Sequence, residues 1–100
     1  MITLTAVIRC KAGSEAMMKE ALLKVARHAR DEESGTIGYF VTQANEAGTF
    51  VTHERYTDQA ALDAHNDGPA ATAFFAGTKG HIEKADIIVG SEIFATHPNP

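Results

Sequence analysis

The spacing of apolar residues switches along this chain between every second residue and a helical period of about 3.6 residues, and the order of these switches restricts the fold more than any other feature of the sequence. Segments in which apolar or β-branched residues alternate are predicted strands, and they span residues 2–10, 36–43, 49–56 and 85–95. Segments with helical spacing are predicted helices, and they span residues 15–33, 59–66 and a stretch from Pro69 to Gly77 or Gly80. A polar turn at 45–48 joins the second strand to the third, so we expect a hairpin there.

The predicted elements form two strand–helix–strand units joined by the hairpin, which is the arrangement of the ferredoxin-like split βαβ fold. In this α+β fold, four antiparallel strands form one sheet and the helices pack on one of its faces. The length of 100 residues is typical of one domain. We therefore predict a single domain over residues 2–95 and a short tail at 96–100. Ser14 is expected to cap the first helix.

The sheet face that carries no helices is predicted to be largely apolar, although a solvated face should be polar. On the last strand, Ile87 and Val89 point to one face, while Ile88 and Phe94 point to the other. Large core residues are also scarce, because alanine supplies 17 of the residues in the 44% hydrophobic fraction. A second copy of the sheet could cover the open face, so we expect a homodimer through the sheet. A monomer with scattered apolar surface residues is the alternative.

Charge, hydropathy and cysteine content argue against several functional classes. The formal net charge is −4 and no basic cluster exceeds two adjacent residues, so no nucleic-acid partner is expected. No apolar run approaches the roughly 18 residues of a membrane span, and the start of the chain does not resemble a signal peptide, so no membrane partner is expected. The single cysteine, Cys10, cannot form an internal disulfide and suits the reducing cytoplasm, where we expect the protein to act.

The sequence contains no motif of a metal, phosphate or dinucleotide site. Its five histidines lack metal-ligand spacing, and its glycines lack the spacing of a phosphate-binding loop. We therefore expect neither a metal nor an organic cofactor.

The most informative segment is HERYTDQAALDAH, residues 53–65. Glu54 and Tyr56 lie two apart on a predicted strand and share a face with Phe50, so they are expected to point between the sheet and the helices. A carboxylate that points inward is costly unless it is paired. The segment therefore indicates either a pocket or a buried Glu that backbone amides or a basic side chain satisfies.

His65 lies near the end of the short predicted helix, three residues after Leu62, so the two side chains share a face. A histidine on the buried side of a helix could act as a base, because its pKa is near neutrality. The alternative is a histidine that bonds the last carbonyls of its own helix.

Apolar residues on the other elements are candidates for the walls of such a pocket. Phe74 and Phe75 follow each other on the next helix, and one of them should line the gap between sheet and helices. Met17 and Met18 on the first helix could add an adaptable wall. Plain core packing is the alternative role for all of them.

Four segments of the chain (KAGSE, TIGYF, GTFVTHERYTDQAALDAH and the last strand) resemble the antibiotic biosynthesis monooxygenase family, which includes small quinol monooxygenases. The resemblance covers about residues 2–95, and its most specific part is the ERY…DQAALDAH run. It implies a ferredoxin-like fold, dimerisation through the sheets and a substrate site between sheet and helices. It also implies, for some members, oxidation of aromatic polyketide or quinol substrates by O2 without metal, flavin or other cofactor.

Two residues of this chain match the family pattern directly: Glu54 matches its Glu, and His65 matches its helix-end His. Tyr56 stands where many members have Trp. A haem-degrading branch of the family carries a haem-ligating His on the helix that follows the loop. Residues 69–77 here contain no His and the chain has no Trp, so it departs from that branch.

These observations predict a cofactor-independent monooxygenase that oxidises a quinol or a hydroxylated, polyketide-like aromatic with O2. We expect His65 to be the base, Tyr56 to stack on or hydrogen-bond the ring, and Glu54 to orient one of them or the substrate. The predicted substrate-binding residues are Phe50, Leu62, Phe74, Phe75 and Met18. The alternatives are an isomerase of a small carbonyl compound and a non-enzymatic protein that binds small molecules.

Overall fold

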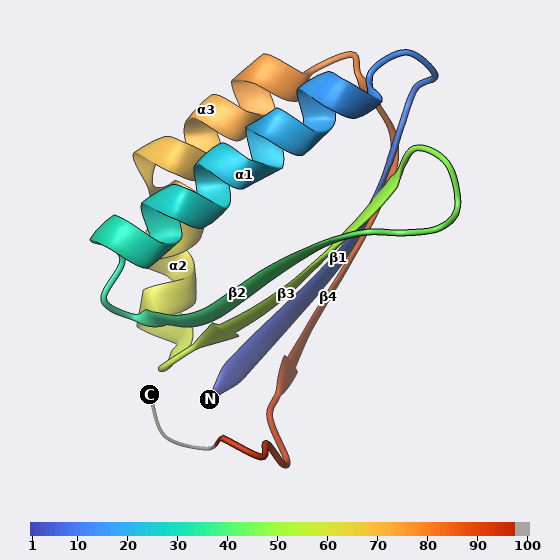
Figure 1. The fold of residues 1–100 in the computed structure, drawn as a ribbon. Helices are drawn as coiled ribbons and strands as arrows, with labels where there is room; N and C mark the ends of the chain where they lie inside the picture. Colours follow the sequence, from blue (N-terminus) through green and yellow to red (C-terminus); the bar gives the residue numbers. More distant parts are fainter. Residues whose placement is uncertain (98–100) are drawn as a thin grey trace.

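A computed structural model describes residues 1–97 of the chain, so the last three residues of the predicted tail lie outside the described residues. The strands are β1 (Ile2–Cys10), β2 (Thr36–Gln43), β3 (Thr49–Tyr56) and β4 (Ile82–Ser91). The helices are α1 (Glu15–Glu32), α2 (Gln59–Asp67) and α3 (Pro69–Thr78). Figure 1 shows the helices on one side of the sheet, with α1 and α3 side by side across it.

The strands form one sheet in the order β2-β3-β1-β4, and every neighbouring pair is antiparallel. This order follows from the two split βαβ units, since each helix connects strands that are separated by one strand of the other unit. The predicted α+β ferredoxin-like fold is therefore confirmed. The central strand β1 alternates between buried and half-buried residues, because one of its faces lies under the helices.

β4 occupies residues 82–91 rather than the predicted 85–95. Its pairing with β1 fixes both ends, since Cys10 is opposite Ile82 and Ile2 is opposite Ser91. The apolar residues Ile93 and Phe94, which were predicted to extend the strand, follow it and are exposed. Pairing with β1 therefore determines the length of β4 more than its own apolar pattern does.

Ser14 is the N-cap residue of α1, but its side chain makes no cap hydrogen bond. Its Oγ instead lies 3.0 Å from Nδ1 of His81, just before β4. The predicted N-cap position of Ser14 is therefore confirmed, but its hydroxyl contacts a tertiary partner instead of the helix amides.

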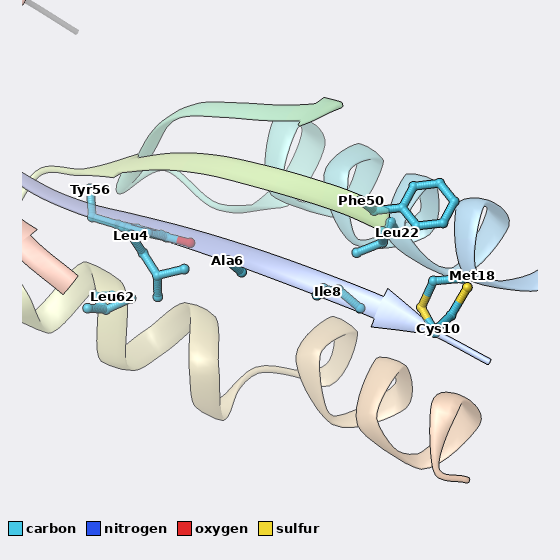
Figure 2. Close-up of a cluster of buried hydrophobic side chains, with 9 residues drawn as sticks. All are labelled: Leu4, Ala6, Ile8, Cys10, Met18, Leu22, Phe50, Tyr56 and Leu62. Carbon is cyan, nitrogen blue, oxygen red and sulfur yellow. The ribbon is translucent and has the colours of Figure 1, made fainter. Parts of the chain in front are cut away.

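The core lies between the sheet and the helices. Leu4, Ala6 and Ile8 follow one another along the buried face of β1, and Figure 2 shows the other side chains of the cluster around them. Phe50 is 1% exposed, and the side chains of Met18 and Tyr56 are fully buried. This packing holds β3 and α1 against β1, and with them the polar residues of the candidate site.

Gly35, between α1 and β2, lies against α2. A methyl group added at Gly35 would lie 2.5 Å from Cβ of Ala61, and the Gly35 carbonyl accepts a hydrogen bond from the Thr57 amide. This contact sets how closely the end of α1 approaches α2.

Gly35→Ala is expected to lower the free energy of unfolding by about 1–3 kcal/mol, because α2 must shift to accommodate the new methyl group. Urea unfolding at a fixed protein concentration measures the change. Gly77→Ala in α3 is the matched control, since nothing lies within 4 Å of the added methyl group. The control should be neutral or more stable by up to about 1 kcal/mol, and equal stability of both variants would contradict the steric argument.

Candidate functional site

A cavity of about 90 Å³ lies between the sheet and the helices. Its walls are mostly apolar and include Leu4 and Ala6 of β1 and Leu22 of α1. Its polar groups come from three other elements and are Tyr39, Thr52, Glu54, His65 and Asn66. An apolar cavity in which a few polar groups converge is the usual form of a small-molecule site.

Glu54 is buried, with 5% of its surface exposed, and it points toward the helices as predicted from its strand position. The hydroxyl of Thr52 donates to Oε2 of Glu54 at 2.7 Å, and the hydroxyl of Tyr56 donates to Oε1. All three residues alternate along one face of β3. The hydrogen-bond partners of this buried carboxylate are thus two hydroxyl groups instead of backbone amides. The basic side chain that the sequence suggested as a partner is also present, since Nε2 of His65 lies 3.8 Å from Oε1 of Glu54.

His65 is 5% exposed and lies between two carboxylates. Its Nδ1 is 2.7 Å from Oε1 of Glu33, and its Nε2 is 3.8 Å from Oε1 of Glu54. The rings of Tyr39 and Tyr56 lie 5.7 and 5.4 Å from the imidazole, centroid to centroid. The imidazole therefore bonds a residue at the end of α1, not the last carbonyls of its own helix.

The local structure of α2 explains how His65 comes to face inward. Asp58 caps the helix by accepting a hydrogen bond from the Ala61 amide at 2.9 Å, and Gly68 ends it. In a helix with this start, Leu62 and His65 lie on the same face, and both are buried.

Glu33, at the C-terminal end of α1, is the functional candidate that sequence reasoning missed. Besides contacting His65, its Oε1 accepts a hydrogen bond from the Thr36 hydroxyl at 2.8 Å, and its Oε2 lies 3.6 Å from Nε2 of His28. The sequence suggested only that α1 stops here. No local pattern could have paired two residues that are 32 positions apart.

Tyr39 also lines the cavity, although no role was predicted for it from the sequence. Burial, and then the negative charges of Glu54 and Glu33, raise the pKa of the Tyr39 hydroxyl. Tyr39 lies directly opposite Glu54 in the β2–β3 pairing, so the register of the hairpin was the signal that could have found it.

Tyr56 is completely buried within the core cluster, where its hydroxyl bonds Glu54. Burial, followed by the hydrogen bond to Glu54 and the charge of that carboxylate, raises the pKa of the Tyr56 hydroxyl. Among the predicted wall residues, Phe74 and Phe75 lie on the cavity lining. Phe50, Met18 and Leu62 belong to the core cluster beside it (Figure 2).

Within residues 1–97, no group of three or more His, Cys, Asp or Glu side chains could hold a metal ion. None of the helices described is long and apolar enough to cross a bilayer.

Comparison with known proteins identifies the family. The sequence model described as "Antibiotic biosynthesis monooxygenase" matches residues 1–77 of the chain. The chain belongs to this family. The match to the antibiotic biosynthesis monooxygenase family includes β1, the β2–β3 hairpin and His65, so the resemblance inferred from the sequence is confirmed.

Solved structures share the fold over nearly the whole chain. Rv0793 of Mycobacterium tuberculosis is 19% identical, covers 95% of this chain and 97% of its own, and superposes with a TM-score of 0.87. NE2512 of Nitrosomonas europaea, a protein of unknown function, is 25% identical over 99% of this chain and 95% of its own, with a TM-score of 0.86. A structure named antibiotic biosynthesis monooxygenase is 19% identical over 93% of this chain and 99% of its own, with a TM-score of 0.85. A search of curated proteins gave no match.

Proposed function

We propose that this protein is a monooxygenase that oxidises a quinol or a hydroxylated aromatic compound with O2 and without a bound cofactor. Membership of the antibiotic biosynthesis monooxygenase family supports the reaction class. The observation that carries the proposal is the buried pair of Glu54 and His65 on the wall of a mostly apolar cavity. A planar aromatic ring suits the apolar walls, and its hydroxyl groups suit the few polar ones.

In the proposed reaction the substrate supplies the electrons. Nε2 of His65 removes a proton from an activated C–H or O–H group, and the resulting anion transfers one electron to O2. The two radicals combine to form a C–O bond, and the proton on His65 passes to the outer oxygen of the peroxide. The remaining C–H bond then breaks together with the O–O bond, and the C–H electron pair forms the C=O bond to the inner oxygen. The outer oxygen leaves as hydroxide and takes up the released proton to become water. For a CH2 group the balance is R2CH2 + O2 → R2CO + H2O.

The other polar residues take supporting roles in this proposal. Tyr39, on the cavity wall, contacts the ring in the way first expected of Tyr56. Tyr56 and Thr52 hold the Glu54 carboxylate in place, and that carboxylate orients a substrate hydroxyl or the imidazole. Phe74 and Phe75 keep water from the reacting anion, which strengthens the polar contacts.

Oxygen uptake tests the proposal. Metal-free protein is incubated with a panel of hydroquinones and anthrones, and O2 consumption and product mass are recorded against autoxidation without protein. We expect O2 uptake above the rate of autoxidation, and we expect the product to contain one oxygen atom more from O2. No uptake across the panel rejects the monooxygenase, and conversion without O2 indicates an isomerase instead. Ligand-induced thermal stabilisation without any turnover indicates a binding protein.

We also propose that the protein works as a homodimer through the open face of its sheet. Phe40 of β2 and Ile88 of β4 lie in one row across this face, because Phe40 pairs with His53, His53 with Thr5 and Thr5 with Ile88. Phe40 is 64% exposed and Ile88 is 69% exposed. A second sheet would bury both.

Ile88→Glu is expected to shift the protein from dimer to monomer, because it would bury a carboxylate at the interface. Sedimentation or size-exclusion chromatography with light scattering measures the mass. Phe75→Glu is the control for the oligomeric state, since Phe75 is also apolar and more than half exposed but lies on α3, away from the open face of the sheet. A wild-type protein that is monomeric at micromolar concentration would contradict the proposal.

A further inference from the structure

We propose that Glu33 is a positioning residue that keeps a proton on Nδ1 of His65, so that His65 gains and loses protons only at Nε2. The catalytic part of this inference rests on the proposed function, but the position of the proton can be measured without any substrate. It adds to the site a carboxylate from α1, whose role is separate from that of Glu54.

The two nitrogens of His65 have unequal partners. Nδ1 is 2.7 Å from the Glu33 carboxylate, which is a full hydrogen-bond distance. An ionised carboxylate only accepts, so Nδ1 must be the donor in this contact. Nε2 is 3.8 Å from Glu54, which is too long for a hydrogen bond to fix a proton there. The imidazole nitrogen on the side of Glu54 is therefore the one that can exchange protons.

The Glu33 carboxylate is itself held in place. Thr36 donates to the same oxygen that His65 contacts, and His28 approaches the other oxygen at 3.6 Å. The Glu33 side chain is 14% exposed, so water competes with these partners only weakly. Since the Thr36 hydroxyl and the Nδ1 proton share Oε1, a rotation of the carboxylate would break both contacts.

The groups around His65 that carry charge come from several elements. Glu33 is the C-cap residue of α1, His28 lies on α1 and contacts Glu33, and Glu54 lies on β3. Tyr39 and Tyr56 face the ring, and burial raises the pKa of both hydroxyls, so both stay neutral between pH 5 and 9. On α2 itself, the remaining acids are exposed, namely Asp63 and Asp67. Glu33 is thus the only one of these groups within hydrogen-bond distance of an imidazole nitrogen among residues 1–97.

The consequence for catalysis is a choice of tautomer. A neutral imidazole has an N–H at one nitrogen and a free lone pair at the other. A hydrogen bond at one nitrogen decides which of the two carries the hydrogen. With the proton held on Nδ1, the lone pair of Nε2 is free to take a substrate proton. The other tautomer would present an N–H in that place and could not act as a base.

Nitrogen-15 NMR of histidine-labelled protein tests the inference. In the neutral imidazole of the wild type, we expect Nδ1 of His65 to show the shift of a protonated nitrogen and Nε2 that of an unprotonated one. In Glu33→Gln, the amide can donate to Nδ1, so we expect the Nε2–H tautomer to become populated. Glu32→Gln is the matched control, because it removes the same charge from the exposed neighbouring residue and should leave the spectrum of His65 unchanged.

Kinetics give a second readout once a substrate is found. Glu33→Gln should lower kcat by about 10²-fold or more with little change in KM, whereas Glu33→Asp should recover part of the loss. Thr36→Val, which removes one anchor of the carboxylate, is a milder variant in case Glu33→Gln does not fold. It should populate the Nε2–H tautomer to a smaller extent.

A wild-type His65 that carries its single proton on Nε2 overturns the inference. So does a Glu33→Gln variant with the wild-type tautomer. If the tautomer changes as expected but no substrate is ever oxidised, the positioning role stands and the proposed function fails.

Discussion

His65→Ala is expected to lower kcat by about 10²- to 10⁴-fold, which is the usual contribution of a general base. His65 is buried, lines the cavity and lies between two carboxylates, so no surface residue can take its place. Substrate should still bind, because the apolar walls remain, and KM should change less than kcat. Steady-state O2 consumption and product formation measure both constants.

Removal of the His65 side chain leaves a space that a free imidazole molecule could fill, which allows a rescue experiment. Added imidazole can enter a cavity of this kind and should restore part of the turnover of His65→Ala. His97→Ala, which removes an exposed histidine from the tail, is the control for loss of a histidine in general and should keep wild-type activity. Far-ultraviolet circular dichroism checks that the variant is folded. A folded His65→Ala protein with turnover within about threefold of wild type would remove His65 from the base role.

Tyr56→Phe is expected to cost about 1.5–3 kcal/mol of stability at neutral pH, because it removes a buried hydrogen bond to a carboxylate. At alkaline pH the difference should shrink. The pKa of the Tyr56 hydroxyl is raised in the folded protein, mainly by burial, so folding favours the protonated phenol. The stability linked to this group is therefore complete below the unfolded pKa near 10 and falls as pH rises above it, by up to about 1.4 kcal/mol per pH unit.

Unfolding by urea at pH 7, 9, 10 and 11 measures this dependence in the wild type and in Tyr56→Phe. The wild type should lose stability faster than the variant above pH 10. Lysines and the other tyrosine titrate in both proteins, so the difference between the two curves isolates Tyr56. A constant difference over the whole range would contradict the buried, proton-retaining phenol.

The sequence alone was enough to predict most of the fold, because the segments concerned have strong hydrophobic periods. β2 and β3 occupy the predicted residues, since a polar turn separates two clear alternating segments. The end of β4 could not be predicted in this way. Apolar residues continue past Ser91 on both faces, and only the length of the neighbouring strand β1 shows where the pairing stops.

The residues of the candidate site likewise fall into those that a local sequence pattern predicts and those that only tertiary contacts reveal. Glu54 and His65 could be found because each shares a face with apolar neighbours on its own element. Predicting Tyr39 requires the register of the hairpin. Predicting Glu33 requires the contact between the segment that follows α1 and helix α2. These contacts join residues that are far apart in the sequence, and no local period encodes them.

The close approach of Gly35 to Ala61 also gives a way to examine relatives of this chain. Any side chain larger than hydrogen at position 35, or larger than methyl at position 61, would move the end of α1 away from α2. Such a protein could keep the fold, the cavity and both site residues on β3 and α2, yet lose the contact between Glu33 and His65. The size of the residues at these two positions, neither of which contacts the cavity, is therefore a marker for whether a relative has the same arrangement around its histidine.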